Sequence, residues 1–144
     1  MYFIQKSILD EIKNTIGITT MESGGIIGAK DNVICAYYFD DKNIGNISEY
    51  IPDTEKLNSI IRAWGNIGIH FIGIVHSHAN AYDKPSLGDK IYADNLIKEN
   101  SFLERVLFPI VTKTNAFVKV DFYEYCKETK AFTSTEVKVL SNTK

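Results

Sequence analysis

The spacing of apolar residues along the chain predicts three helices. In the first, apolar residues three or four apart share one face, and Gly17 ends the helix. The apolar set of this helix is Ile4, Ile8, Leu9, Ile12 and Ile16. The second helix begins at Asp53 or Thr54, either of which is a suitable N-cap. Its apolar set is Leu57, Ile60, Ile61 and Trp64. The third helix is predicted over residues 86–100.

Continuous apolar runs predict the strands between these helices. Residues 24–29 and 33–40 flank the turn-like Lys30-Asp31-Asn32 and therefore indicate a hairpin. A central strand, covered on both sides, is predicted over residues 71–78, because FIGIVHSH is apolar on both alternating faces up to its histidines. The polar segments 41–53 and 79–85 have the composition of loops.

The C-terminal part predicts three more strands. Two of them, over residues 105–112 and 116–125, are joined by the turn Lys113-Thr114-Asn115, and the third, over residues 130–140, is an edge strand. Helices alternate with strands, but the hairpins are too many for a pure βαβ sheet. We therefore expect an α/β (mixed α+β) fold class.

The composition narrows the class of protein. A chain of 144 residues with 44% hydrophobic and 24% charged residues is an ordinary globular sequence, and we expect a single domain over 1–144. The net charge of −2 gives no basic field, so neither nucleic acid nor a membrane surface is an expected partner. The polar residues Gln5 and Lys6 near the N-terminus argue against a signal peptide, no apolar run has the length of a membrane span, and Cys35 and Cys126 form no C-x-x-C motif. We expect a cytoplasmic protein with reduced cysteines.

Two histidines and an aspartate form the candidate chemical site. His76 and His78 lie two residues apart in the predicted central strand, so both side chains leave the same face and offer two imidazoles to one cation. On the third predicted helix, Ser86 and Asp89 fall on a largely apolar face that is expected to turn toward the protein. A carboxylate on that face is costly unless a positive group meets it, and a zinc ion held by the histidines would do so.

A helix cap is the competing explanation. Taken alone, Ser86 and Asp89 have the spacing of an N-cap and the third residue of a first helical turn. A single histidine at the end of a strand is usually structural. All four residues together form H-x-H-x7-S-x2-D, which is rare by chance in a chain of this length and favours a metal site. Capping and metal ligation are compatible with each other.

Other metal sites that use two histidines fit less well. A metallo-β-lactamase-like site needs Asp and His directly after the pair, where Asn80 and Ala81 stand. Cupin and carbonic anhydrase sites need a further histidine downstream, whereas His70 lies upstream. A deaminase needs H-x-E and a later P-C-x-x-C, which the chain lacks. Barrel amidohydrolases are much longer chains.

The motif resembles that of the JAMM/MPN+ (JAB1/Mov34/PAD-1-like) zinc metalloproteases, which have a glutamate upstream of H-x-H-x7-S-x2-D. The segment MESGGIIGA at 21–29 resembles the family's glutamate before a glycine-rich first strand and nominates Glu22. The order of elements follows the family over roughly residues 1–125. The resemblance implies a single JAB/MPN-type domain of the minimal prokaryotic kind. Its sheet is expected to be curved, mostly antiparallel and flanked by helices, like that of cytidine deaminases.

The resemblance also implies a mechanism. One Zn²⁺ per chain would be held by His76, His78 and Asp89, with a bound water in the open position. Zinc lowers the pKa of such a water toward ~7. Glu22 would take the proton of this water and pass it to the leaving amine, and the Ser86 hydroxyl would donate to the developing oxyanion.

The implied reaction is hydrolysis of a peptide or isopeptide bond, often after the C-terminal tail of a ubiquitin-like modifier. A ubiquitin-like protein or its conjugate is the expected substrate, with E1-like and E2-like proteins as possible partners. Two alternatives stay open: a metallopeptidase acting on a small peptide, a sulfur-carrier adduct or a cell-wall or phage-tail substrate, and a non-catalytic MPN scaffold. The loops 41–53 and 79–85 are expected near the cleft, with Tyr82 and Asp83 as plain loop residues or substrate contacts.

Overall fold

A computed structural model describes residues 1–18, 22–40, 54–78, 82–114 and 117–141. The predicted loop over 41–53, with its Asp53 cap, lies outside the described residues, as do residues 79–81 of the predicted loop over 79–85. Within the described part of the chain, no helix is both long enough and apolar enough to cross a membrane.

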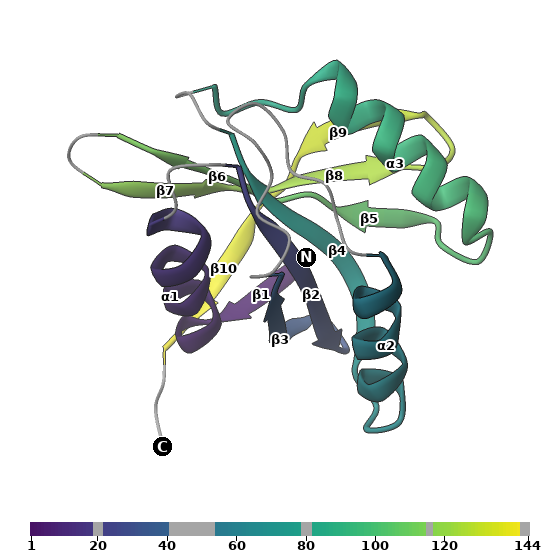
Figure 1. Ribbon diagram of the computed structural model, residues 1–144, viewed down its shortest axis with the longest axis horizontal. Helices are drawn as coiled ribbons and strands as arrows, with labels where there is room; N and C mark the ends of the chain where they lie inside the picture. Colours follow the sequence, from purple (N-terminus) through teal and green to yellow (C-terminus); the bar gives the residue numbers. More distant parts are fainter. Residues whose placement is uncertain (19–21, 41–53, 79–81, 115–116, 142–144) are drawn as a thin grey trace.

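Helices are interspersed with strands up to α3, and strands alone follow it in the described residues (Figure 1). The helices are α1 (Lys6–Thr15), the short 3₁₀ helix η1 (Ile16–Ile18), α2 (Thr54–Gly65) and α3 (Leu87–Glu99). The strands of the first half are β1 (Tyr2–Gln5), β2 (Gly24–Lys30), β3 (Val33–Phe39) and β4 (His70–Ser77). Those of the second half are β5 (Arg105–Leu107), β6 (Ile110–Lys113), β7 (Val118–Asp121), β8 (Tyr123–Cys126), β9 (Ala131–Ser134) and β10 (Val137–Leu140).

The described strands form one mixed sheet in the order β10-β1-β3-β2-β4-β5-β8-β9, with β6 and β7 branching from β4. β2 and β3 form the predicted hairpin, in which Asp31 has a positive φ of 53°. Five of the described pairings are antiparallel and four are parallel, so the predicted antiparallel majority is slight. β4 is central, as predicted, because it pairs with β2 on one side and with β5 and β6 on the other.

The sheet is strongly curled. β9 and β10 lie at opposite ends of the strand order, yet only two residues, 135 and 136, separate them in the chain. Across the curl, the Tyr2 hydroxyl of β1 lies 3.3 Å from the Glu124 carboxylate of β8. The predicted single edge strand over 130–140 is therefore two strands, which occupy both edges of the sheet.

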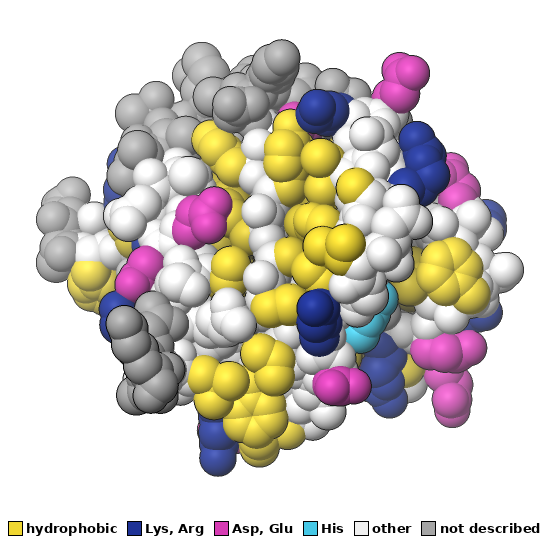
Figure 2. Space-filling model, turned by 90° about the horizontal axis from the view of Figure 1, so that it is seen from below, with side chains coloured by type: hydrophobic (Ala, Val, Ile, Leu, Met, Phe, Trp, Pro, Cys, Tyr) yellow, Lys and Arg dark blue, Asp and Glu magenta, His cyan; other side chains and the backbone are white. Residues whose placement is uncertain are grey.

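The two faces of the sheet have separate cores. The α1 face buries a cluster rich in isoleucine: Ile4, Ile8, Ile12, Ile16, Ile27, Ala29, Ile34, Ile72, Val75, Leu107 and Val111. The face under α2 and α3 buries a second cluster with more aromatic residues: Ile26, Leu57, Ile74, Ala93, Ile97, Val106, Phe108 and Tyr125. Seen from below, apolar side chains gather in the middle of the surface and charged side chains lie beside them (Figure 2).

Three more predicted elements have wrong bounds. Ile4 belongs to β1, not to the first helix, because Tyr2–Gln5 pairs in parallel with β3 and β10 before the chain turns into α1. The predicted strand over 105–112 is divided at Pro109, which has no N–H to donate to a ladder. Its first half, β5, pairs with β8, and its second half, β6, pairs with β7. The predicted strand over 116–125 is therefore also two strands, β7 and β8.

Candidate metal centre

The sheet backbone positions the two histidines. His76 lies in β4, and its N–H donates to the carbonyl of Pro109 at 3.2 Å. His78 follows the end of the strand, and its N–H lies 3.3 Å from the carbonyl of Val111. Alternation along the strand sends both imidazoles to the same face. The His76 ring also packs edge-on against Phe108, with ring centroids 5.5 Å apart, in the core under α3.

The N-terminus of α3 positions the carboxylate. Ser86 is the N-cap, and its hydroxyl accepts the Asp89 N–H at 3.1 Å. In return, Asp89 Oδ2 accepts the Ser86 N–H at 2.9 Å, which completes a capping box. The apolar face predicted for this helix is confirmed, because Ala93 and Ile97 are buried in the core. The geometry is therefore compatible with both explanations of the motif: Ser86 and Asp89 cap the helix, and Asp89 also faces the histidines.

Three potential ligand atoms converge at this point. His76 Nε2 lies 2.9 Å from Asp89 Oδ1, and His78 Nε2 lies 3.1 Å from Asp89 Oδ2. One ligand atom from each of the three residues lies within 4.8 Å of the others. Two ligand atoms of a tetrahedral zinc site are ~3.3 Å apart, given bond lengths of about 2.0–2.1 Å. The spacing of the cluster is therefore suitable for one small cation.

The electrostatics of the cluster couple its members. Burial opposes ionisation of Asp89, but the imidazoles of His76 and His78 outweigh burial and hold the pKa of that carboxyl well below its usual range. Burial also acts to lower the pKa of His78. The hydrogen bonds to Asp89 and to the Tyr82 carbonyl outweigh that effect, and the pKa of His78 is raised. Asp89 is thus ionised and ready to serve as an anionic ligand.

His76 provides an independent test of whether a metal fits. Its side chain is only 6% exposed, and neither ring nitrogen makes a hydrogen bond of acceptable geometry within the described residues. Its Nε2 lies 2.9 Å from Asp89 Oδ1 outside good hydrogen-bond geometry, and its Nδ1 has no partner among the described residues, so the buried ring has lost its water without full compensation. A metal ion bound at Nε2 would remove part of that cost. The donor set of two imidazoles and one carboxylate matches the ligands that zinc takes in catalytic sites.

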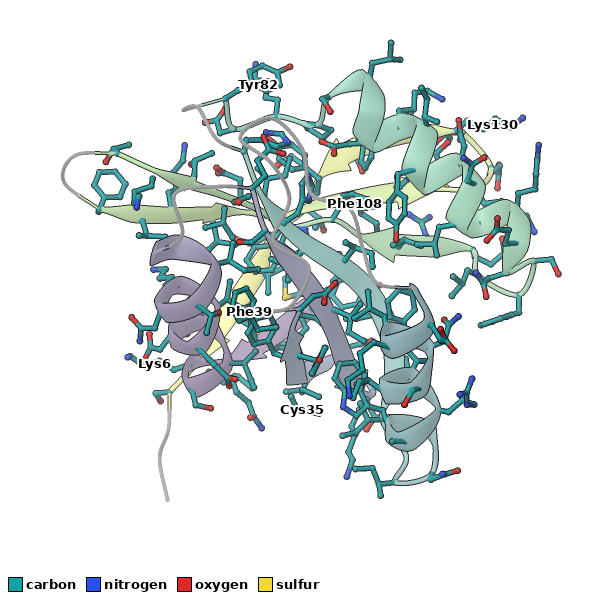
Figure 3. All side chains as sticks on the ribbon, viewed as in Figure 1. Lys6, Cys35, Phe39, Tyr82, Phe108 and Lys130 are labelled. Atoms are coloured by element: carbon teal, nitrogen blue, oxygen red, sulfur yellow. The ribbon has the colours of Figure 1, made fainter. Side chains whose placement is uncertain are left out.

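His78 has the partner that metal-binding histidines usually have. Its Nδ1 lies 2.8 Å from the carbonyl oxygen of Tyr82 and donates a hydrogen bond to it. This contact fixes the ring and directs Nε2 toward Asp89. The Tyr82 ring stacks on the imidazole with centroids 5.8 Å apart and an interplanar angle of 17°. Tyr82 is labelled in Figure 3, where it lies beyond the end of β4.

Glu22 lies beside the histidine pair. In the antiparallel ladder between β2 and β4, Gly24 is opposite His76. The residue two places before Gly24 therefore lies alongside the residue two places after His76, which is His78. In agreement, the negative charge of Glu22 contributes to the raised pKa of His78. The structure thus brings Glu22 to the site, and its catalytic role stays a prediction.

Sequence reasoning missed three contacts around the site. Tyr82 was given no contact with the histidines, and Lys119 and Tyr123 were given no role. Lys119 and Tyr123 each donate a hydrogen bond to Asp83, which lies between the histidines and α3. They lie 36 and 40 residues from Asp83, so no local pattern reveals them. The cysteines predicted to be reduced are free thiols.

Comparison of the chain with known proteins gives a fold and no close relative. No protein-family model and no curated protein matches the sequence. Among solved structures, the solution structure of protein DSY2949 from Desulfitobacterium hafniense superposes with a TM-score of 0.78 at 15% identity. The match covers 99% of this chain and 94% of that protein.

Two further structures connect the fold to the JAB1/MPN domain. AF2198, a JAB1/MPN domain protein from Archaeoglobus fulgidus, matches with a TM-score of 0.57 at 15% identity, over 97% of each chain. A structure described as JAMM, a metalloprotease-like zinc site in the proteasome and signalosome, matches with a TM-score of 0.50 at 14% identity, over 97% of this chain and 98% of that one. The chain therefore has a JAB1/MPN-type fold, with a His-His-Asp cluster compatible with a zinc site.

Proposed function

We propose that this protein is a zinc-dependent metallopeptidase that hydrolyses peptide or isopeptide bonds. The observation that carries the proposal is the convergence of His76, His78 and Asp89 ligand atoms within 4.8 Å, with both ring nitrogens of His76 buried and Asp89 as the described polar neighbour of its Nε2. A set of three protein ligands with a position left open is typical of catalytic zinc. The JAB1/MPN-type fold around the cluster supports the same assignment.

The chain's own residues divide the work around the metal. Bound zinc would supply a Lewis acid that activates water and polarises the scissile carbonyl. Glu22, beside His78, accepts the proton of the attacking water and returns it to the leaving amine. The Ser86 hydroxyl accepts the Asp89 N–H through a lone pair, so its own proton is available to the oxyanion of the tetrahedral intermediate.

The proposed substrate is a ubiquitin-like protein or its conjugate, cleaved after the C-terminal tail, with E1-like and E2-like proteins as proposed partners. A groove of about 890 Å³ between α2, β4 and α3 supports a macromolecular substrate. Tyr92, one helical turn beyond Asp89, lines it together with Leu57 and Ile74. The three ligand residues do not line this groove, and Ile74 and Tyr92 are its lining residues nearest to them along the chain. A folded modifier docked in the groove would have to extend its tail past these two residues to reach the site.

Metal content is the first test. Protein purified without chelator is expected to carry one zinc per chain, and Asp89→Ala is expected to lose it. Asp10→Ala is the matched control, because Asp10 is an exposed acid on α1 whose described partner is Lys6. A parent protein that holds no zinc and takes none up on addition would contradict the proposal and leave the scaffold alternative.

Activity is the second test. Cleavage of ubiquitin-like proteins carrying a C-terminal extension is expected for the zinc-loaded parent and is expected to fall by at least ~10² in Glu22→Gln. Because Glu22 is a proposed base and not a ligand, Glu22→Gln should keep its zinc. Loss of zinc from this variant would contradict the role assigned to Glu22. Cleavage of unrelated extended peptides at the same rate would contradict the modifier as substrate.

A further inference from the structure

We propose that Lys119 and Tyr123 are positioning residues for the metal centre, a role that rests on the proposed zinc site. They hold Asp83, and Asp83 holds the neighbouring carbonyl that orients His78. We call these two side chains, with Asp83, the loop clamp. Neither side chain contacts the ligand cluster itself.

The clamp consists of three polar contacts. Lys119 Nζ lies 2.6 Å from Asp83 Oδ2 and 3.3 Å from Asp121 Oδ2. The Tyr123 hydroxyl donates to the main-chain carbonyl of Asp83 at 2.8 Å. Asp83 is therefore bound through its side chain and its backbone by two different strands, β7 and β8.

The strand register places the clamp on the face that carries the histidines. Across the parallel pair β4–β6, His76 is opposite Ile110, and across the antiparallel pair β6–β7, Ile110 is opposite Asp121. Directly paired residues point to the same face of a sheet. Lys119 is two residues from Asp121 and shares that face. Its side chain thus reaches the loop from a strand that is anchored to β4.

Asp83 transmits this attachment to His78. The peptide group that joins Tyr82 to Asp83 includes the Tyr82 carbonyl, which accepts the His78 Nδ1 hydrogen at 2.8 Å. Because that group is planar, fixing Asp83 restricts the direction of the carbonyl. The carbonyl in turn keeps the hydrogen on Nδ1 and leaves Nε2 for the metal.

This role makes a distinctive prediction. Lys119 and Asp83 are each more than one-third exposed, and an ion pair of this kind contributes little to the stability of the fold. Loss of the partner that orients a metal-binding histidine, in contrast, typically lowers metal affinity by about 10–100-fold. If the clamp were only structural, its loss would lower the melting temperature and leave zinc affinity unchanged. If it positions His78, its loss lowers zinc affinity and leaves the melting temperature unchanged.

The test compares zinc affinity with stability in matched variants. Lys119→Met keeps the aliphatic stem and removes the charge, and Tyr123→Phe removes only the hydroxyl. Lys113→Met is the control, because Lys113 is an exposed lysine on the same hairpin. Competition with a chelator is expected to show about 10-fold weaker zinc binding in Lys119→Met and in Tyr123→Phe, with Lys113→Met unchanged. Lys119→Arg should restore the affinity, and all melting temperatures of the metal-free proteins should stay close to that of the parent.

Two further comparisons make the result decisive. Asp83→Asn combined with Lys119→Met should bind zinc no more weakly than the weaker single variant, because both changes break one contact. In the cobalt-substituted protein, the d–d absorption should change in Lys119→Met and not in Lys113→Met. Zinc affinity equal to that of the parent in both clamp variants overturns the clamp and leaves the zinc site standing. A parent that binds no zinc overturns both proposals.

Discussion

The two halves of the candidate metal centre are held in different ways. The histidine half is part of the sheet: His76 lies in β4, which pairs on both sides, and its place is fixed by backbone hydrogen bonds. The carboxylate half lies on the first turn of α3 and is fixed by side chains. Ser86 caps the turn, and its N–H donates to the Asp89 carboxylate.

This difference separates stability from function along the chain. A change in the sheet that carries the histidines should act on the whole fold, because β4 is the strand to which β2, β5 and β6 are all attached. A change around the start of α3 should act on the site first. The buried residues of α3, Ala93 and Ile97, lie further along the helix, so the first turn contributes little to the core. The predictions below test this division from the larger effect to the smaller.

The largest effect is expected for Gly73→Ala in β4. A Cβ at this position would lie 2.3 Å from the backbone carbonyl oxygen of Leu107, so β4 and β5 would have to separate. We expect a loss of about 3 kcal/mol in the free energy of unfolding, measured by urea denaturation of the metal-free protein. Gly65→Ala is the control, because a Cβ there meets nothing within 4 Å. A free energy of unfolding for Gly73→Ala equal to that of the control would show that β4 and β5 can accommodate a Cβ between them without loss of stability.

A smaller effect on stability, with a large effect on function, is expected at Ser86. Ser86→Ala removes the cap and should cost about 1 kcal/mol, whereas Ser86→Gly should cost only a few tenths. Both variants lack the hydroxyl proposed to stabilise the oxyanion, so both should lose ~10²–10³ in kcat.

The pair of Ser86 variants distinguishes the two roles of this residue. Unequal melting temperatures with equal loss of kcat would assign capping and oxyanion stabilisation to the same hydroxyl. If kcat instead followed stability, so that Ser86→Gly retained most of the activity, the hydroxyl would be a cap without a catalytic role.

Local chemistry made part of this centre predictable from the sequence. The spacing of His76, His78, Ser86 and Asp89 is set by one strand end and one helix start, and each of those elements has a local signal. The same holds for the hairpin of β2 and β3, whose turn contains Asp31.

Contacts between distant segments were not predictable. Ile4 fits the helical spacing of Ile8 and still belongs to a strand, because its partners in β10 lie more than 130 residues away. Pro109 was included in a strand on the strength of its apolar neighbours, although it has no donor for a ladder. Lys119 and Tyr123 are ordinary strand residues in the sequence, and only the folded sheet brings them to Asp83.

The smallest effect, and the sharpest test of the carboxylate half, is expected for Gly88→Ala in the first turn of α3. The new Cβ would have Ser86 Oγ at 3.7 Å as its near neighbour, which is an ordinary contact, and Gly88 does not have a positive φ. Alanine restricts the unfolded chain and favours the helix, so the free energy of unfolding should rise by about 0.5 kcal/mol. Zinc affinity should not change, because the cap and Asp89 keep their places. Weaker zinc binding in a more stable Gly88→Ala protein would mean that the carboxylate depends on freedom of the first helical turn, and not on the cap that holds it in this structure.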